Sequence, residues 1–235
     1  MRLVILLTAG GMLLSSVAFA LFDDFDGYAD QAAFNAAWPG APAPMSLVTD
    51  RAYSDGQSIY QGTAAQLSYK YVSSVPTSQL YFSCWFYDPM GTGSLARTYA
   101  MVYSRAGDTW AGALQQILAI GKYNSITTTK YNYRVALGAG SGWFALDSGP
   151  DRSVGWHLAE IVGKPDGTVD FKIDGIVGAN KAVAEVGFNW VVVGSGLTST
   201  HGMWFDDVRM VPEPGSLLAL GAGMIGLAGY IRRRR

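Results

Sequence analysis

The chain has 235 residues, with 17 basic and 18 acidic side chains and a net charge of −1. This length suffices for one sizeable domain. The sequence has no basic stripe interleaved with aromatic residues, which argues against nucleic acid as a partner. Cys84 is the only cysteine, so no internal disulfide can form.

The first 20 residues have the pattern of a secretory signal peptide. Arg2 supplies a positive start, residues 3–14 are apolar, and Ala18-Phe19-Ala20 has the small-residue spacing of a cleavage site. We expect cleavage after Ala20, with the Sec translocon and signal peptidase as partners. An uncleaved N-terminal anchor is the alternative, and the shortness of the apolar segment disfavours it.

Residues 21–211 contain short alternating runs separated by Gly, Pro, Asn, Asp and Ser. Many short strands with turn signals predict one all-β domain, an antiparallel sandwich or barrel. A short helix is expected at 30–38, capped by Asp30. The candidate strands are 22–26, 67–72, 80–87, 99–104, 116–120, 131–137, 156–162, 169–173, 191–194 and 203–210.

Residues 155–178 carry the clearest hairpin pattern, W-H-x-x-E-I-V, a Pro-Asp-Gly turn, then V-x-F-x-I-D-G. This pattern resembles the central hairpin of concanavalin A-like, laminin-G-like jelly rolls. The stretch FDDFDGY at 22–28 resembles the opening of such domains, and MWFDDVRM at 203–210 resembles their closing strand. The resemblance implies a jelly-roll β-sandwich over residues 21–211, with its first and last strands as neighbours.

Neighbouring terminal strands would bring together two clusters of aspartates. Calcium prefers several carboxylate and carbonyl oxygens, so a structural calcium ion is one interpretation. The other is that both clusters face solvent and accept hydrogen bonds from turn amides. The aspartates concerned are Asp23, Asp24, Asp26, Asp206 and Asp207.

Aromatic residues on strand faces are the candidate glycan-binding groups. In residues 80–87, strand parity places Tyr81, Trp85 and Tyr87 on one face and the apolar side chains on the other, so these three rings are available for the apolar faces of sugars. Tyr131 and Tyr133 share a face of another candidate strand. The alternative for each ring is a place in the core or on the second sheet face.

Carboxylates are poorly arranged for polysaccharide hydrolysis. Glu160 and Glu185 are the only glutamates in residues 21–211, and the E-x-D-x-x-E and E-x-D-x-E motifs of glucanases with this fold are missing. His157 and His201 have no cysteine beside them, which disfavours a zinc site. We therefore expect no catalytic residues. A divergent polysaccharide-degrading enzyme, a hydrolase or a lyase, is the alternative.

The chain ends in VPEPGSLLALGAGMIGLAGYIRRRR, an apolar run followed by four arginines. This ending resembles the PEP-CTERM sorting signal of Gram-negative bacteria, which implies recognition and removal by an exosortase after transient anchoring in the inner membrane. We expect residues 212–235 to be this signal and its transmembrane helix. Its landmarks are Pro212, Glu213, Pro214, Arg232, Arg233, Arg234 and Arg235.

These patterns together predict an exported protein of the cell surface or extracellular matrix. Its domain would bind glycan without catalysis, or take a structural place in an exopolysaccharide.

Overall fold

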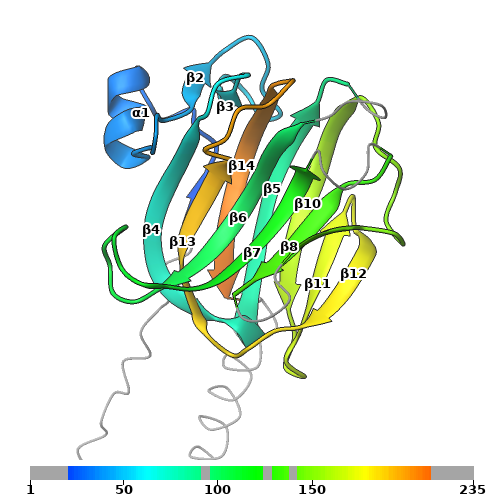
Figure 1. Ribbon diagram of the computed structural model, residues 1–235. Coiled ribbons are helices and arrows are strands. Elements are labelled where there is room, and N and C mark those ends of the chain that lie inside the picture. Colours follow the sequence, from blue (N-terminus) through cyan, green and yellow to red (C-terminus); the bar gives the residue numbers. More distant parts are fainter. Residues whose placement is uncertain (1–20, 91–95, 124–128, 138–141, 213–235) are drawn as a thin grey trace, which may run out of the picture.

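The computed structural model describes residues 21–90, 96–123, 129–137 and 142–212 (Figure 1). The predicted signal peptide at 1–20 lies outside these residues, as do Glu213, Pro214, the apolar run and the terminal arginines. Within the described ranges, no helix is long and apolar enough to cross a membrane.

Two antiparallel sheets pack face to face, which confirms the predicted all-β sandwich (Figure 1). Sheet A has the order β12-β11-β10-β5-β14-β3-β2, with β1 also paired to β14. Its strands are β1 Leu21–Asp23, β2 Ser46–Val48, β3 Ser58–Gln61, β5 Leu80–Asp88, β10 Gly155–Gly163, β11 Thr168–Ile173, β12 Ile176–Ala182 and β14 Met203–Pro212.

Sheet B lies in front of sheet A in the view of Figure 1 and has the order β4-β13-β6-β7-β8-β9. Its strands are β4 Leu67–Pro76, β6 Arg97–Arg105, β7 Leu114–Tyr123, β8 Asn132–Ala136, β9 Gly142–Ala145 and β13 Gly187–Gly194. Every strand pairing in both sheets is antiparallel.

The core lies between the two sheets and follows strand alternation. In β5, Phe82, Cys84 and Phe86 are buried on the inner face. Opposite them, β7 contributes Leu118 and Ile120 from sheet B. Successive side chains of a strand point to opposite faces, so the residues between these point outward. The predicted parity of residues 80–87 is therefore confirmed.

Four strands were missing from the sequence prediction: β2, β3, β9 and β12. Three of them have only three or four residues, too few to establish an alternation. β12, at the edge of sheet A, is mostly exposed, so its IVGANKA sequence has no buried face to mark it. Their pairing partners, rather than their own side chains, define these strands.

The terminal strands pair as expected, with Leu21 opposite Met210. The predicted helix is α1, Gln31–Ala37, and the Asp30 carboxylate accepts a hydrogen bond from the Ala33 N–H at 2.8 Å. Phe34 is fully buried and fixes the helix against the sandwich. Figure 1 shows α1 beside β4 and β2, at one end of the molecule.

Candidate functional site

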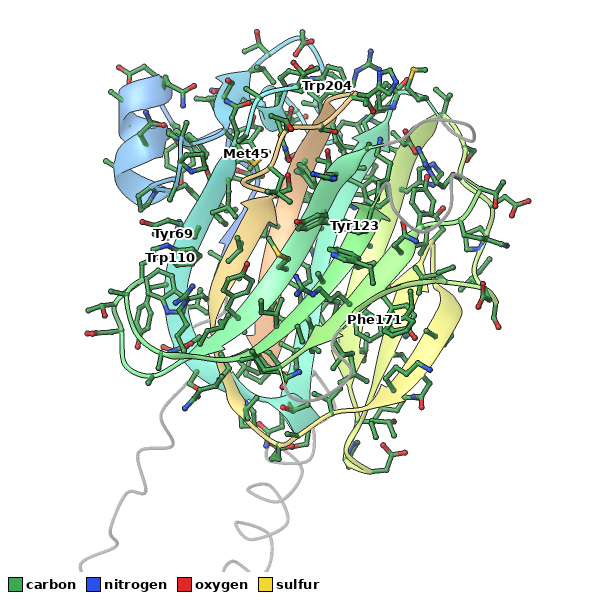
Figure 2. All side chains as sticks on the ribbon, viewed as in Figure 1. Met45, Tyr69, Trp110, Tyr123, Phe171 and Trp204 are labelled. Carbon is green, nitrogen blue, oxygen red and sulfur yellow. The ribbon has the colours of Figure 1, made fainter. Side chains whose placement is uncertain are left out.

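A row of aromatic side chains crosses the outer face of sheet A. The register places Trp156 of β10 opposite Tyr87 of β5, Tyr87 opposite Trp204 of β14, and Trp204 opposite Tyr60 of β3. Successive ring centroids are 5.6, 5.9 and 4.5 Å apart. All four rings are half-buried. We call these four residues the aromatic row; Trp204 is labelled in Figure 2.

The β2–β3 loop, residues 49–57, lies against this row. Tyr53 stacks on Trp85 with ring centroids 3.8 Å apart, and 44% of Tyr53 is exposed. The Arg51 guanidinium is 3.8 Å from the centre of the Tyr87 ring and 4.9 Å from that of Trp204. The loop therefore extends the aromatic surface away from the sheet.

Asp206 holds this loop in place. Its fully buried carboxylate accepts hydrogen bonds from the Tyr53 N–H at 2.7 Å, the Ser54 N–H at 3.2 Å and the Asp207 N–H at 2.8 Å. Burial raises the pKa of Asp206 to about 6, although the three N–H groups favour its charged form. Asp206 thus fixes the part of the loop that places Tyr53 on Trp85, while Asp26 accepts from the Gly56 N–H at 3.0 Å further along the loop.

The predicted glycan-binding residues have different outcomes. Tyr81, Trp85 and Tyr87 do point outward from sheet A, and all three are half-buried. The Tyr81 hydroxyl donates to Glu160 at 3.1 Å, and Trp85 is covered by Tyr53. Only Tyr87 belongs to the aromatic row.

For Tyr131 and Tyr133 the prediction was wrong, because both rings belong to the core. Tyr131 has no exposed surface and Tyr133 is 4% exposed. Tyr131 packs edge-on against Phe86 with centroids 5.2 Å apart, and Tyr133 packs against Phe171 at 4.9 Å. Their face of β8 turns towards sheet A, which one strand alone could not reveal.

The outer face of sheet B carries a second aromatic cluster. Trp110, from the turn between β6 and β7, stacks on Tyr69 of β4 at 3.9 Å and contacts Trp190 of β13 at 5.5 Å. Tyr123 of β7 stacks on Trp143 of β9 at 4.7 Å. Figure 2 shows Tyr69 and Trp110 together at the β4 edge, with Tyr123 further across the sheet. Trp190 is only 5% exposed, so these rings cover one another.

The five aspartates proposed as calcium ligands make separate contacts. The Asp23 carboxylate accepts from Lys70 at 2.9 Å and from the Trp38 indole at 2.8 Å. Asp26 accepts from the N–H of Gln57 at 2.6 Å. Asp24 accepts from the Asp26 N–H at 3.2 Å, and Asp207 lies 3.6 Å from Arg209.

Pairing of the terminal strands therefore does not gather these oxygens at one position. Asp23 faces the ammonium group of Lys70, whereas Asp206 lies under the β2–β3 loop. In the parts of the chain that the structure describes, no three His, Cys, Asp or Glu side chains are grouped to hold a metal ion.

The two glutamates lie in different places. Glu160, on β10, accepts a hydrogen bond from Tyr81, whereas Glu185 accepts from the N–H of Ser78 at 3.1 Å in the turn that leads into β5. They do not form the pair of facing carboxyl groups that glycoside hydrolysis uses.

Ser153, His157 and Asp174 are placed like a hydrolase triad. His157 Nδ1 lies 2.7 Å from Asp174 Oδ2, and Nε2 lies 3.2 Å from Ser153 Oγ. Nε2 is closer still, 3.0 Å, to the Ser153 carbonyl oxygen, which can only accept a hydrogen bond.

Both ring nitrogens of His157 thus face acceptors, an arrangement that favours the doubly protonated imidazolium. Burial opposes this charge, but the bonds to Asp174 and to the Ser153 carbonyl raise the pKa of His157 above its ordinary value. The contacts of His157 join the loop that precedes β10 to the β11–β12 turn, and at Nε2 the Ser153 carbonyl oxygen competes with the Ser153 hydroxyl.

Several residues of both aromatic surfaces were missed from the sequence. Trp156 and Trp204 are next to core residues of their strands, so parity alone marks them as outward. Which rings contact one another depends on strand register, and register pairs residues that are far apart in the sequence. The missed residues are Arg51, Tyr53, Tyr60, Trp156 and Trp204 on sheet A, and Tyr69, Tyr71, Tyr103, Trp110 and Trp190 on sheet B.

The described fold is shared with several solved structures. The globular domain of T. cruzi calreticulin superposes with a TM-score of 0.57 at 11% identity, covering 90% of this chain and 94% of that one. Cellulose induced protein Cip1 gives 0.53 at 17% identity, covering 81% and 96%. Carbohydrate esterase vb_24B_21 of bacteriophage phi24B gives 0.51 at 10% identity, covering 75% and 90%.

No curated protein matches this sequence. Residues 211–235 match the family model of the PEP-CTERM protein-sorting motif, as the Pro-Glu-Pro, apolar and arginine pattern predicted. The chain therefore carries a PEP-CTERM sorting motif behind its β-sandwich, which marks it as an exported, membrane-anchored protein sorted through an exosortase.

Proposed function

We propose that this protein binds polysaccharide at the aromatic row of sheet A without cleaving it. The observation that carries the proposal is the register of the row, which aligns half-exposed rings on four adjacent strands. Adjacent strands lie about 4.8 Å apart. Successive rings can therefore contact the apolar faces of sugar units along one chain.

The β2–β3 loop adds polar and aromatic groups beside the row. Tyr53 presents a ring raised above the sheet by Trp85, and Asp50 accepts a hydrogen bond from the Trp204 indole at 3.1 Å. Sugar-binding surfaces combine apolar rings with a few polar groups that fix orientation. A contiguous patch of partly exposed rings beside the exposed Tyr53 supports an interaction surface here.

The sorting motif supports a polysaccharide as the natural partner. An exported protein, released by an exosortase after signal peptidase and Sec-dependent export, reaches the cell surface or the extracellular matrix. The glycan we propose there is the exopolysaccharide of a Gram-negative bacterium.

The test compares two aromatic substitutions in the full chain, with a soluble neutral β-glucan as the probe. Trp204→Ala should weaken β-glucan binding by more than about 1 kcal/mol, as the loss of an anchor ring does. Phe144→Ala is the matched control, because Phe144 is 45% exposed on β9 and lies outside the row. Equal binding by both variants would refute the assignment of the site.

The non-catalytic part of the proposal has its own measurement. Incubation of the β-glucan with the full chain should release no new reducing ends. Reducing ends that appear with the unmutated chain, and disappear with Glu160→Gln, would establish the divergent hydrolase instead. Unsaturated sugar products from an acidic polysaccharide, detected by ultraviolet absorbance, would establish a lyase.

A further inference from the structure

The strands of the two sheets differ in their charge. None of the six strands of sheet B contains an aspartate or glutamate. The strands of sheet A contain Asp23, Asp88, Glu160, Asp170, Asp206 and Asp207. Positive charge on the outer face of sheet B therefore has no acidic neighbour within its own strands.

Three arginines lie on that face. Arg97, on β6, is 6.0 Å from the centre of the Tyr123 ring, and the other two, Arg105 and Arg134, each have an unpartnered Nε. The side chain of Arg134, on β8, makes no hydrogen bond or ion pair with any residue that the structure describes, and its buried Nε has no partner. Arg105, at the end of β6, donates from Nη1 to the Gly112 carbonyl at 2.8 Å, but its buried Nε is likewise unpartnered. The Arg105 guanidinium lies 4.2 Å from the centre of the Trp110 ring.

Tyr103 lies on the same face, and the Arg105 guanidinium is 5.4 Å from the centre of its ring. Arg134 is in register, through Ala119 of β7, with Met101, which is two residues before Tyr103 on that face. Burial raises the pKa of the Tyr103 hydroxyl, and the charges of Arg105 and Arg134 oppose this rise. In the register, Tyr103 is opposite Trp190, whose indole N–H is a third buried donor without a partner. Trp190 is 5% exposed.

The Trp190 indole is covered by the neighbouring rings, so the two donors that an outside acceptor would satisfy are the Nε groups of Arg105 and Arg134. Native proteins pair nearly all buried polar groups, and an unpaired one calls for an explanation such as a ligand. A carboxylate only accepts hydrogen bonds, and arginine binds it with two parallel N–H donors. The rings beside these arginines offer apolar surface: Tyr69 and Tyr103 are half-buried, and 48% of Tyr71 is exposed.

We propose that the outer face of sheet B is a second binding site, for the carboxylate groups of an acidic polysaccharide. Arg105 and Arg134 bind the carboxylates, and Tyr69, Tyr71 and Trp110 contact the sugar rings. This site lies on the opposite side of the sandwich from the aromatic row and does not depend on it.

The test uses the full chain, with alginate as the acidic polysaccharide and dextran as the neutral one. At low salt, alginate should bind at least tenfold more tightly than dextran, and added salt should reduce this preference. Arg105→Gln combined with Arg134→Gln should lower alginate affinity at least tenfold. Arg134→Gln alone should produce part of this loss with an unchanged melting temperature, since the Arg134 side chain makes no hydrogen bond with the described residues that the change would remove.

Arg209→Gln is the matched control, because Arg209 is an exposed arginine on β14 of sheet A. It removes the same charge and should leave alginate affinity within about twofold. Equal affinity for alginate and dextran, no loss in the double variant, or the same loss in Arg209→Gln would each overturn the proposal. Trp204→Ala should retain alginate binding, so the two sites can fail independently.

Discussion

The two outer faces of the sandwich use the same aromatic residue types in different ways. On sheet A, Trp204 is half-exposed in a row that crosses four strands, and acidic and basic side chains are mixed around it. On sheet B, Trp190 is 5% exposed under Tyr69, Tyr71 and Trp110, and the strands of the sheet contain arginines and lysines but no aspartate or glutamate. Both tryptophans face outward, but Trp204 of sheet A is partly exposed, whereas Trp190 of sheet B is part of a second small core.

The cause of the difference is the connection that crosses each face. The β6–β7 turn brings Trp110 across sheet B to stack on Tyr69, which closes the cluster. The β2–β3 loop packs over one end of sheet A, where Asp206 holds Tyr53 and Ser54 and Arg51 lies over Tyr87 and Trp204, and the rings of the aromatic row stay partly exposed. Exposure of an outward ring is therefore decided by loops rather than by the strand that bears it.

The largest loss of stability should come from truncating Trp190, the buried one of the two tryptophans. Trp190→Ala should lower the free energy of unfolding by about 3–5 kcal/mol, the usual cost of deleting a buried aromatic side chain. Trp204→Ala should cost clearly less, because Trp204 is only partly buried. Denaturant unfolding of both variants measures this. Equal losses would mean that the two faces are packed alike.

The pH dependence of folding stability tests the role of Asp206, which lies on sheet A. Its pKa of about 6 in the folded chain exceeds the ordinary value of 3.8, so the folded state binds its proton more tightly. The resulting stabilisation is complete below about pH 4 and is lost as the pH rises through 6, with a size on the order of 2–3 kcal/mol.

Thermal unfolding between pH 4 and pH 7 checks this prediction, with Asp206→Asn as the control. The variant lacks the titrating group, so its stability should change less with pH over this window. A slope that is identical in both proteins would show that another group is responsible.

A smaller effect, a loss of β-glucan affinity, is expected when either ring of the Tyr53–Trp85 stack over sheet A is removed. Tyr53→Ala should weaken β-glucan binding by about 1 kcal/mol or more and cost little stability, because Tyr53 is exposed at the end of its stack. Trp85→Ala should weaken binding through the loss of support for Tyr53. The double variant should therefore bind about as weakly as either single variant. Additive losses would mean that Trp85 contacts the glycan itself.

The smallest expected effect is the change of binding affinity with ionic strength, which should differ between the two proposed ligands. Raising the salt from about 0.01 to 1 M shortens the Debye length from roughly 30 to 3 Å. Alginate binding at sheet B should weaken, whereas β-glucan binding at the aromatic row should stay nearly constant. Isothermal titration at both salt concentrations measures this, and parallel weakening would contradict the separation of the sites.

Local patterns in the sequence predicted much of the sandwich. Alternation in residues 80–87 and the Asp30 helix cap depend on neighbours within a few residues, and both were confirmed. The same parity rule succeeded for Tyr87 and failed for Tyr131, because parity separates two faces without saying which one meets the other sheet. The four short or edge strands also escaped it, since they are identified by their partners.

The sequence by itself determined the sorting motif, the all-β class and the outward direction of Tyr81, Trp85 and Tyr87, because each depends on order and spacing along a short stretch. Only the tertiary structure decided that Trp156, Tyr87, Trp204 and Tyr60 form one row, that Tyr53 covers Trp85, and that Arg105 and Arg134 lie on one face of a sheet whose strands contain no acidic residue. These facts depend on strand register and on loops that join residues up to about 150 positions apart, such as Tyr53 and Asp206. No local pattern encodes such distances.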